Sequence, residues 1–178
     1  MQRRVRGVPF RQTRKGHDMN AALAPKDEHA LPLYVLGEED AAFWAAQQDD
    51  RVRTWVDANG FSGAIGQALV IPDEQGHPKA ALAGYGTAEK RKRGRFTLAA
   101  ALGTLAVGTY YIERGVPEDR LEEETLGWLL ASYSFDRYKK NAVPKPVLVT
   151  PKGVDAERVM VMAEAECLTR DLINTPAA

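Results

Sequence analysis

The densest group of chemically active side chains in this sequence is a run of five cations. The run comprises Lys90, Arg91, Lys92, Arg93 and Arg95. Clustered lysine and arginine side chains attract phosphates and other anions. No aromatic residue is interleaved with them, although single-stranded nucleic acid usually needs aromatic rings for stacking. The run therefore predicts a loop that binds an anion or a partner protein, or a solvated loop, and nucleic acid is not the expected partner.

Two glycine-rich segments, at residues 60–66 and 84–86, are the next candidates for binding. Backbone amides in such loops can cradle a phosphate group. Neither segment matches the dinucleotide-binding fingerprint, because the first follows a predicted helix and the second lacks a third glycine. We expect these glycines mainly to permit turns with positive φ.

The side chains that usually perform catalysis are sparse and scattered. His17, His29 and His77 do not show metal-ligand spacing with any cysteine or carboxylate pair. Cys167 lies on a predicted helix stripe, which favours a buried and unreactive thiol. The acidic run at 122–124 falls early in a predicted helix, so we expect its carboxylates to be solvated. The sequence predicts neither a catalytic nor a metal-binding residue.

Strands and helices alternate along the chain. Apolar runs of strand length are separated by turn residues, and longer segments show helical spacing. The expected strands are at 31–36, 67–72, 79–84, 108–112 and 147–149, and the expected helices lie within 38–58 (two helices broken near Asp49), at 96–105, 117–140 and 155–173. The second and third strands form a hairpin, so the expected class is α/β, with a mixed sheet flanked by helices.

Composition indicates one folded domain preceded by a basic tail. The chain has 178 residues and a formal net charge of zero, which excludes a strong overall field toward anionic partners. The only cysteine is Cys167, and no apolar run reaches the length of a membrane span. We therefore expect a cytoplasmic protein without a membrane partner. Residues 1–30 carry six cations before the first acid, Asp18, and are expected to form a disordered tail.

Two segments together suggest a family. Thr169-Arg-Asp-Leu-Ile-Asn-Thr-Pro-Ala-Ala178 resembles the segment that joins the N-terminal domain of M17 leucyl aminopeptidases to their catalytic domain. Gly127-Trp-Leu-Leu-Ala-Ser-Tyr-Ser-Phe-Asp-Arg-Tyr-Lys139 resembles an aromatic helix of the same family. The resemblance implies a three-layer, macro-domain-like fold over residues 31–173, followed at 174–178 by the start of a linker to a catalytic domain that is missing here.

The resemblance also implies a function for the longer protein. M17 enzymes are metallo-exopeptidases that release N-terminal residues from peptides with two divalent ions, manganese or zinc, and they assemble as hexamers. Their Asn-Thr-Asp-Ala-Glu-Gly-Arg signature is absent from this sequence, so no catalytic residue and no cofactor is carried over. We expect this chain alone to be inactive and to serve assembly and substrate access, with its own catalytic domain and a homohexamer as partners.

The aromatic residues of the second segment can be interpreted in two ways. Aromatics at helical spacing usually supply core area. Under the resemblance, Trp128, Phe135 and Tyr138 also become candidates for an interface with the catalytic domain.

One alternative function stays open as well. The chain would then be a free-standing macro-like module that binds ADP-ribose, another nucleotide or nucleic acid through its glycine loops or its cationic run.

Overall fold

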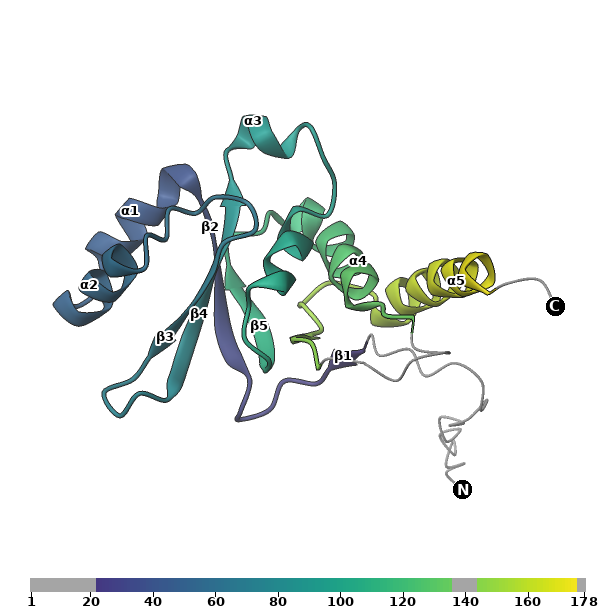
Figure 1. Cartoon of the computed structure of the whole chain (residues 1–178), viewed down its shortest axis with the longest axis horizontal. Coiled ribbons are helices and arrows are strands. Elements are labelled where there is room, and N and C mark those ends of the chain that lie inside the picture. Colours follow the sequence, from purple (N-terminus) through teal and green to yellow (C-terminus); the bar gives the residue numbers. More distant parts are fainter. Residues whose placement is uncertain (1–21, 136–143, 176–178) are drawn as a thin grey trace, which may run out of the picture.

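The computed structural model describes residues 22–135 and 144–175, which form one six-stranded mixed sheet with helices on both faces (Figure 1). The strand order is β1-β6-β5-β2-β4-β3. All neighbours pair in parallel except β3 and β4, which form an antiparallel hairpin. The strands are β1 (Leu23–Ala24), β2 (Leu31–Gly37), β3 (Ala68–Pro72), β4 (Pro78–Gly86), β5 (Thr109–Arg114) and β6 (Val147–Val149). The predicted α/β class is confirmed.

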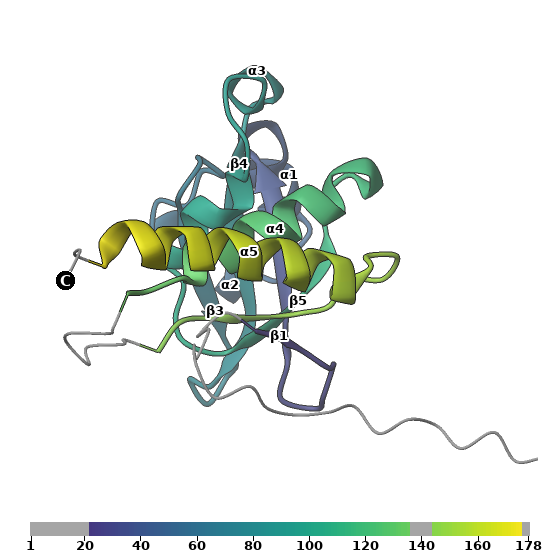
Figure 2. The ribbon, with the colours of Figure 1, turned by 90° about the vertical axis from the view of Figure 1, so that its right-hand side faces the viewer.

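The helices form three groups around this sheet (Figures 1 and 2). One face carries α1 (Glu38–Ala46) and α2 (Asp50–Ala58), and the other carries the 3₁₀ helix η1 (Thr97–Gly103) and α4 (Leu121–Ser132). The last helix, α5 (Ala156–Asn174), packs on the outer side of α4. Two short helices, α3 (Ala88–Arg91) and η2 (Glu118–Arg120), lie in connections.

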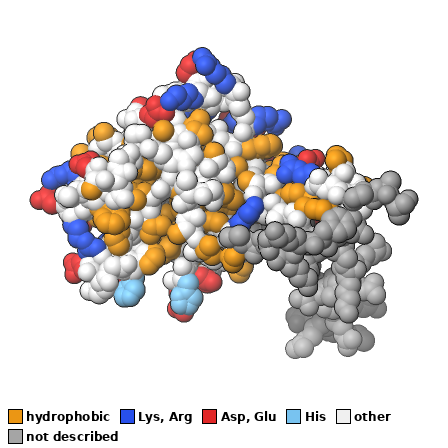
Figure 3. All heavy atoms as spheres, in the orientation of Figure 1, with side chains coloured by type: hydrophobic (Ala, Val, Ile, Leu, Met, Phe, Trp, Pro, Cys, Tyr) orange, Lys and Arg blue, Asp and Glu red, His pale blue; other side chains and the backbone are white. Residues whose placement is uncertain are grey.

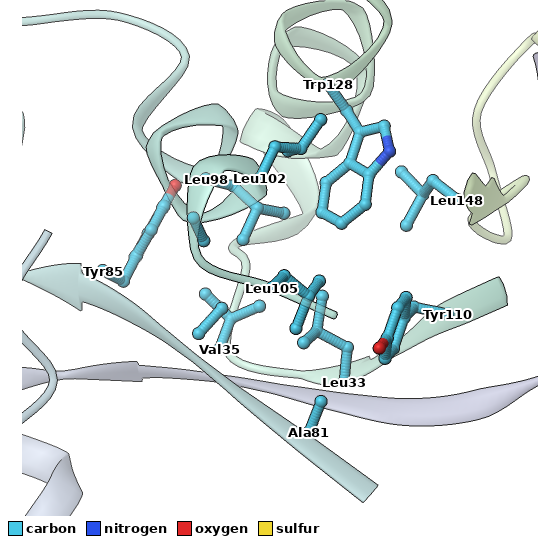
Figure 4. Close-up of a cluster of buried hydrophobic side chains, with 12 residues drawn as sticks. Leu33, Val35, Ala81, Tyr85, Leu98, Leu102, Leu105, Tyr110, Trp128 and Leu148 are labelled. Carbon is cyan, nitrogen blue, oxygen red and sulfur yellow. The ribbon is translucent and has the colours of Figure 1, made fainter. Parts of the chain in front are cut away.

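The central strands are apolar on both faces, because helices cover both sides of the sheet. Leu33 and Val35 of β2 point into the cluster beneath η1 and α4, whereas Leu36 joins the cluster beneath α1 and α2. Trp128 of α4 points from the helix toward the sheet, beside Leu148, in the first cluster (Figure 4).

The predicted helix at 117–140 is shorter than expected. Helix α4 ends at Ser132, and Tyr133 has extended geometry, with φ −57° and ψ 137°. The Lys145 ammonium donates to the carbonyls of Ala131 and Tyr133, 2.8 and 3.1 Å away, and so satisfies groups that a continuing helix would have used. Pro117 precedes η2 instead of occupying the first turn of α4. Residues 136–143 lie outside the described residues.

The predicted tail also differs at its end. Leu23–Ala24 form β1, which pairs in parallel with Leu148 and Val149 of β6. This part of the 1–30 segment therefore adds an edge strand to the sheet. Residues 1–21, which hold most of the basic side chains, lie outside the described residues.

Candidate interdomain surface

Helix α5 forms as its sequence predicts and buries one narrow stripe. The Asp155 carboxylate accepts the backbone N–H of Arg158 at 3.1 Å and caps the N-terminus. Val159, Ala163 and Cys167 are buried against Leu129 of α4. Burial raises the pKa of the Cys167 thiol, which disfavours the reactive thiolate.

The opposite face of α5 is apolar and exposed. Val161, Leu168 and Leu172 are 59%, 48% and 68% exposed on this face, whereas Ile173, at the end of the helix and off this face, is 78% exposed. With Ala165, the first three follow the 4-3-4 spacing by which a helix presents a continuous stripe to a partner. Helix α5 is the outermost layer on this side of the molecule (Figure 2). These residues thus define an exposed apolar strip, the outer stripe of α5.

Acidic residues border the outer stripe. Glu157 and Glu164 are exposed and lie seven residues apart, on the same side of the stripe. Two copies of α5 packed antiparallel, stripe to stripe, would place their acidic sides next to each other, which is unfavourable. A partner with an apolar patch and cations along its rim would match the outer stripe better than a second α5.

A small polar cluster joins the end of α5 to the end of α4. The Tyr133 hydroxyl donates to Asp171 Oδ1 at 2.7 Å, and Arg170 Nη1 donates to the carbonyl of Leu130 at 3.2 Å. Asn174 Nδ2 donates to the Tyr133 hydroxyl at 3.4 Å. Burial and the Asp171 carboxylate raise the pKa of Tyr133. The two sequence segments that suggested a family therefore contact each other.

The predicted aromatic interface residues lie in different places. Trp128 is 0% exposed, and its indole N–H donates to the carbonyl of Pro146 at 3.2 Å. Its prediction as an interface residue is wrong, because its ring fills the space between α4 and the sheet (Figure 4). Phe135 is half-buried just after α4, and Tyr138 lies outside the described residues.

Most cations of the run at 90–95 are already paired. Lys90 contacts Glu38 at 2.7 Å, Arg95 contacts Glu123 at 2.6 Å, and Lys92 contacts Glu89 at 3.4 Å. Arg91 donates to the carbonyls of Tyr85 and Gly86. Among the described residues, only the Arg93 side chain of this run has no ion pair or hydrogen bond. The run stands on the projection around α3, beside acidic residues (Figure 3), so its net field is weak.

The glycine loops are packed against each other. The N–H of Gly84 donates to Gln67 and the N–H of Gly86 donates to Gly63, both at 2.8 Å. Gly63 has φ 78°, and a Cβ there would lie 2.5 Å from the carbonyl oxygen of Gly37. These glycines are needed for close backbone contact, and the amides of Gly84 and Gly86 are occupied. The contacts give the nucleotide-binding alternative no support.

Comparison with known proteins identifies the family. The model of the "M17 aminopeptidase, N-terminal domain" matches residues 31–151. This chain belongs to that family. It is 26% identical to a probable cytosol aminopeptidase of Leifsonia xyli subsp. xyli, over 87% of this chain and 34% of the relative.

Solved aminopeptidase structures share the fold of this domain. A cytosol aminopeptidase from Coxiella burnetii superposes with a TM-score of 0.74 at 27% identity, over 85% of this chain and 32% of that one. A tomato leucine aminopeptidase mutant gives a TM-score of 0.59 at 18% identity, over 92% and 40%, which shows the fold alone. The chain thus spans about a third of the length of the curated relative and of the Coxiella structure.

The residues described here do not fit the metal chemistry of the M17 family. Within 22–135 and 144–175, no group of three or more His, Cys, Asp or Glu side chains is placed to hold a metal ion. We therefore derive no metal-dependent step from these residues. In the same ranges, no helix is long and apolar enough to cross a membrane.

Sequence reasoning missed one buried carboxylate of this M17 domain. Glu124 is 0% exposed, although the sequence predicts that it is solvated. It accepts the Tyr85 hydroxyl at 2.8 Å and the backbone N–H of Leu98 at 2.9 Å. Its partners lie 39 and 26 residues away, and no local sequence signal identifies them.

Proposed function

We propose that this N-terminal domain docks onto the catalytic domain of an M17 aminopeptidase through the outer stripe of α5. One observation carries the proposal: the last helix is buried on its inner side and apolar on its outer side. An exposed apolar strip of this kind usually marks an interaction surface. The linker predicted at 174–178 would start at the end of α5 and keep the two domains close.

Cations on the partner are expected along the Glu157 and Glu164 side of the outer stripe. The joint between Tyr133 and Asp171 would set the angle at which α5 meets the partner, since it fixes the C-terminal half of the helix to α4. Half-buried Phe135 lies next to this joint and would border the same interface.

The proposed activity of the longer protein is the release of N-terminal residues from peptides. Family membership supports this, and the similar proteins from Leifsonia and Coxiella are named as cytosol aminopeptidases. Two divalent ions, manganese or zinc, would be held by the catalytic domain. A hexamer and a cytoplasmic location belong to the same proposal. The domain described here would contribute assembly and substrate access.

The first test concerns activity. The purified chain with manganese should not hydrolyse leucine p-nitroanilide, because its described residues provide no metal cluster. Metal-dependent turnover that persists through further purification would contradict the proposed division of labour.

The second test concerns docking. In a chimera, this chain would replace the matched third of the Leifsonia enzyme. Hydrolysis of leucine p-nitroanilide and the molecular mass of the assembled chimera would be measured. The double change Leu168→Glu and Leu172→Glu should lower both, because it places charge in the buried interface. Val107→Glu is the matched control, since Val107 is 63% exposed but lies outside α5. An active chimera that tolerates both sets of changes equally would contradict docking through the outer stripe.

A further inference from the structure

Strand β3 lies at one edge of the sheet, opposite to the β1 edge, and its register shows which backbone groups face outward. Leu69 pairs with Leu82 and Ile71 pairs with Ala80, and the Gly84 N–H donates to Gln67. In an antiparallel ladder, alternate residues direct both their N–H and C=O groups toward the same neighbour. The groups of residues 67, 69 and 71 therefore face β4, whereas those of residues 68, 70 and 72 face away from the sheet.

Two side chains of α2 occupy outward carbonyls of this edge. The Trp55 indole N–H donates to the carbonyl of Val70 at 3.0 Å. Arg51 Nη2 donates to the carbonyl of Pro72 at 3.1 Å. Pro72 has no backbone N–H, so it offers no donor at the end of the edge. The outward donors that remain are the N–H groups of Ala68 and Val70.

The two carbonyls that Trp55 and Arg51 occupy are the acceptors that pairing between β3 strands of two copies would need. In an antiparallel pair of two β3 edges centred on Val70, each Val70 N–H would donate to the other Val70 carbonyl. Ala68 would face Pro72 of the other copy and donate to its carbonyl. All four intermolecular hydrogen bonds would therefore end on carbonyls that Trp55 and Arg51 now occupy.

Helix α2 buries few of its own side chains, and Trp55 and Arg51 contact β3 from its exposed surface. Val56 is the one buried residue of this helix. Beside the strand, a groove of about 470 Å³ is lined by Val52, Trp55 and Ile71. The Trp55 side chain is 41% exposed, and its indole N–H is bonded to the Val70 carbonyl.

We propose that α2 is an edge guard, whose Trp55 and Arg51 side chains prevent β3 from pairing with β3 of a second copy of this chain. An uncovered edge strand is a template for such pairing. The guard acts by occupying acceptors, and Pro72 adds to it by removing a donor. This proposal is independent of docking by α5, which lies on the opposite side of the sheet (Figure 1).

The test removes the two side-chain donors that bond to β3 and keeps side chains of similar size. Arg51→Met and Trp55→Phe are combined in the 178-residue chain, and mass is followed against concentration by sedimentation velocity. Four new hydrogen bonds are expected to strengthen dimer formation about tenfold or more over the unchanged chain. The matched control combines Arg53→Met with Phe43→Leu, which alters exposed side chains of α2 and α1 without touching β3. It should behave like the unchanged chain.

A rescue variant identifies the surface involved. Adding Val70→Pro removes an outward N–H and leaves the bonds to β4 intact, so it should return the guard variant to the mass of the unchanged chain. Association that Val70→Pro does not reverse would overturn the proposal, as would no increase in mass. Should the double variant unfold by circular dichroism, Trp55→Phe alone is used with amide exchange. Slower exchange of the Val70 N–H at high concentration supports pairing, and concentration-independent exchange overturns it.

Discussion

At the residue scale, Glu124 is a buried carboxylate that holds three parts of the domain together. Its side chain starts on α4, one oxygen accepts the Tyr85 hydroxyl of β4, and the other accepts the Leu98 N–H in the first turn of η1. Phe96, before η1, has no side-chain cap. The carboxylate therefore supplies from a neighbouring helix the acceptor that an N-cap residue normally provides.

Replacing Glu124 with leucine should destabilise the domain strongly. The change keeps bulk but leaves the Tyr85 hydroxyl and the Leu98 N–H buried without acceptors, each costing about 1–3 kcal/mol. We expect the free energy of unfolding in urea to fall by about 2–4 kcal/mol. Glu122→Leu is the control, because Glu122 is partly exposed and makes only a 3.5 Å contact with Arg158. Equal losses for the two variants would contradict a capping role for Glu124.

Tyr85 should make stability fall at alkaline pH. Burial, followed by the charge of Glu124, raises the pKa of the Tyr85 phenol above its ordinary value of 10.0. Below pH 10 the Tyr85 phenol keeps its proton in both the folded and the unfolded chain. Above pH 10 the phenol ionises first in the unfolded chain, so the free energy of unfolding falls as pH rises toward the folded pKa. One such group contributes a slope of about 1.4 kcal/mol per pH unit.

Tyr85→Phe should reduce this slope when urea unfolding is compared between pH 9 and pH 11, a range chosen around the ordinary tyrosine value of about 10. Part of the slope should remain, because burial also raises the pKa of Tyr110. A slope unchanged by Tyr85→Phe would show that Tyr85 loses its proton equally easily in both states.

At the element scale, the close contact between η1 and α4 requires a residue without a side chain, Gly127, on α4. Phe96 has φ 58°, which is uncommon for a residue other than glycine, and its ring lies over Gly127. A Cβ at position 127 would lie 2.5 Å from the Phe96 Cβ and 2.8 Å from its ring. Gly127 and Glu124 are three residues apart on one face of α4, so the same face both packs and caps η1.

Gly127→Ala should therefore be destabilising although alanine favours helix. The helical gain of about 1 kcal/mol opposes an overlap that forces Phe96 or η1 to move. We expect a net loss of about 1–2 kcal/mol in thermal or urea unfolding. Gly103→Ala is the control, since a Cβ at Gly103 meets no atom within 4 Å. A stabilised Gly127→Ala variant would mean that η1 yields easily and does not constrain α4.

Elements whose ends are encoded locally were predictable from the sequence. Asp49 and Asp155 cap α2 and α5 with their own side chains, and turn residues between two apolar runs predicted the β3–β4 hairpin. The end of α4 was not predictable, because the group that satisfies its last carbonyls, the Lys145 ammonium, comes from a later segment of the chain. The burial of Glu124 escaped prediction for the same reason.

At the scale of the whole molecule, α5 is an outer layer. Its inner side packs on α4, and within the described residues its outer side contacts no other element. The Tyr133–Asp171 bond and the Arg170 contact fix its end to α4, while the buried stripe holds its middle. Because both contacts use the inner side, the orientation of the outer stripe is set by the domain itself. The surface is therefore preformed and would lose little conformational freedom on docking.

A preformed apolar strip should be detectable in the isolated chain. We expect the dye ANS, which fluoresces at exposed apolar surfaces, to bind the folded chain through the outer stripe. Leu168→Glu with Leu172→Glu should reduce this fluorescence roughly twofold or more, since two of the largest exposed side chains of α5 become charged. Val107→Glu should reduce it little, because an isolated exposed valine is not a patch. Circular dichroism must show that all three proteins remain folded. If the α5 variant binds as much dye as the unchanged chain, the apolar surface lies elsewhere, and docking through α5 loses its physical basis.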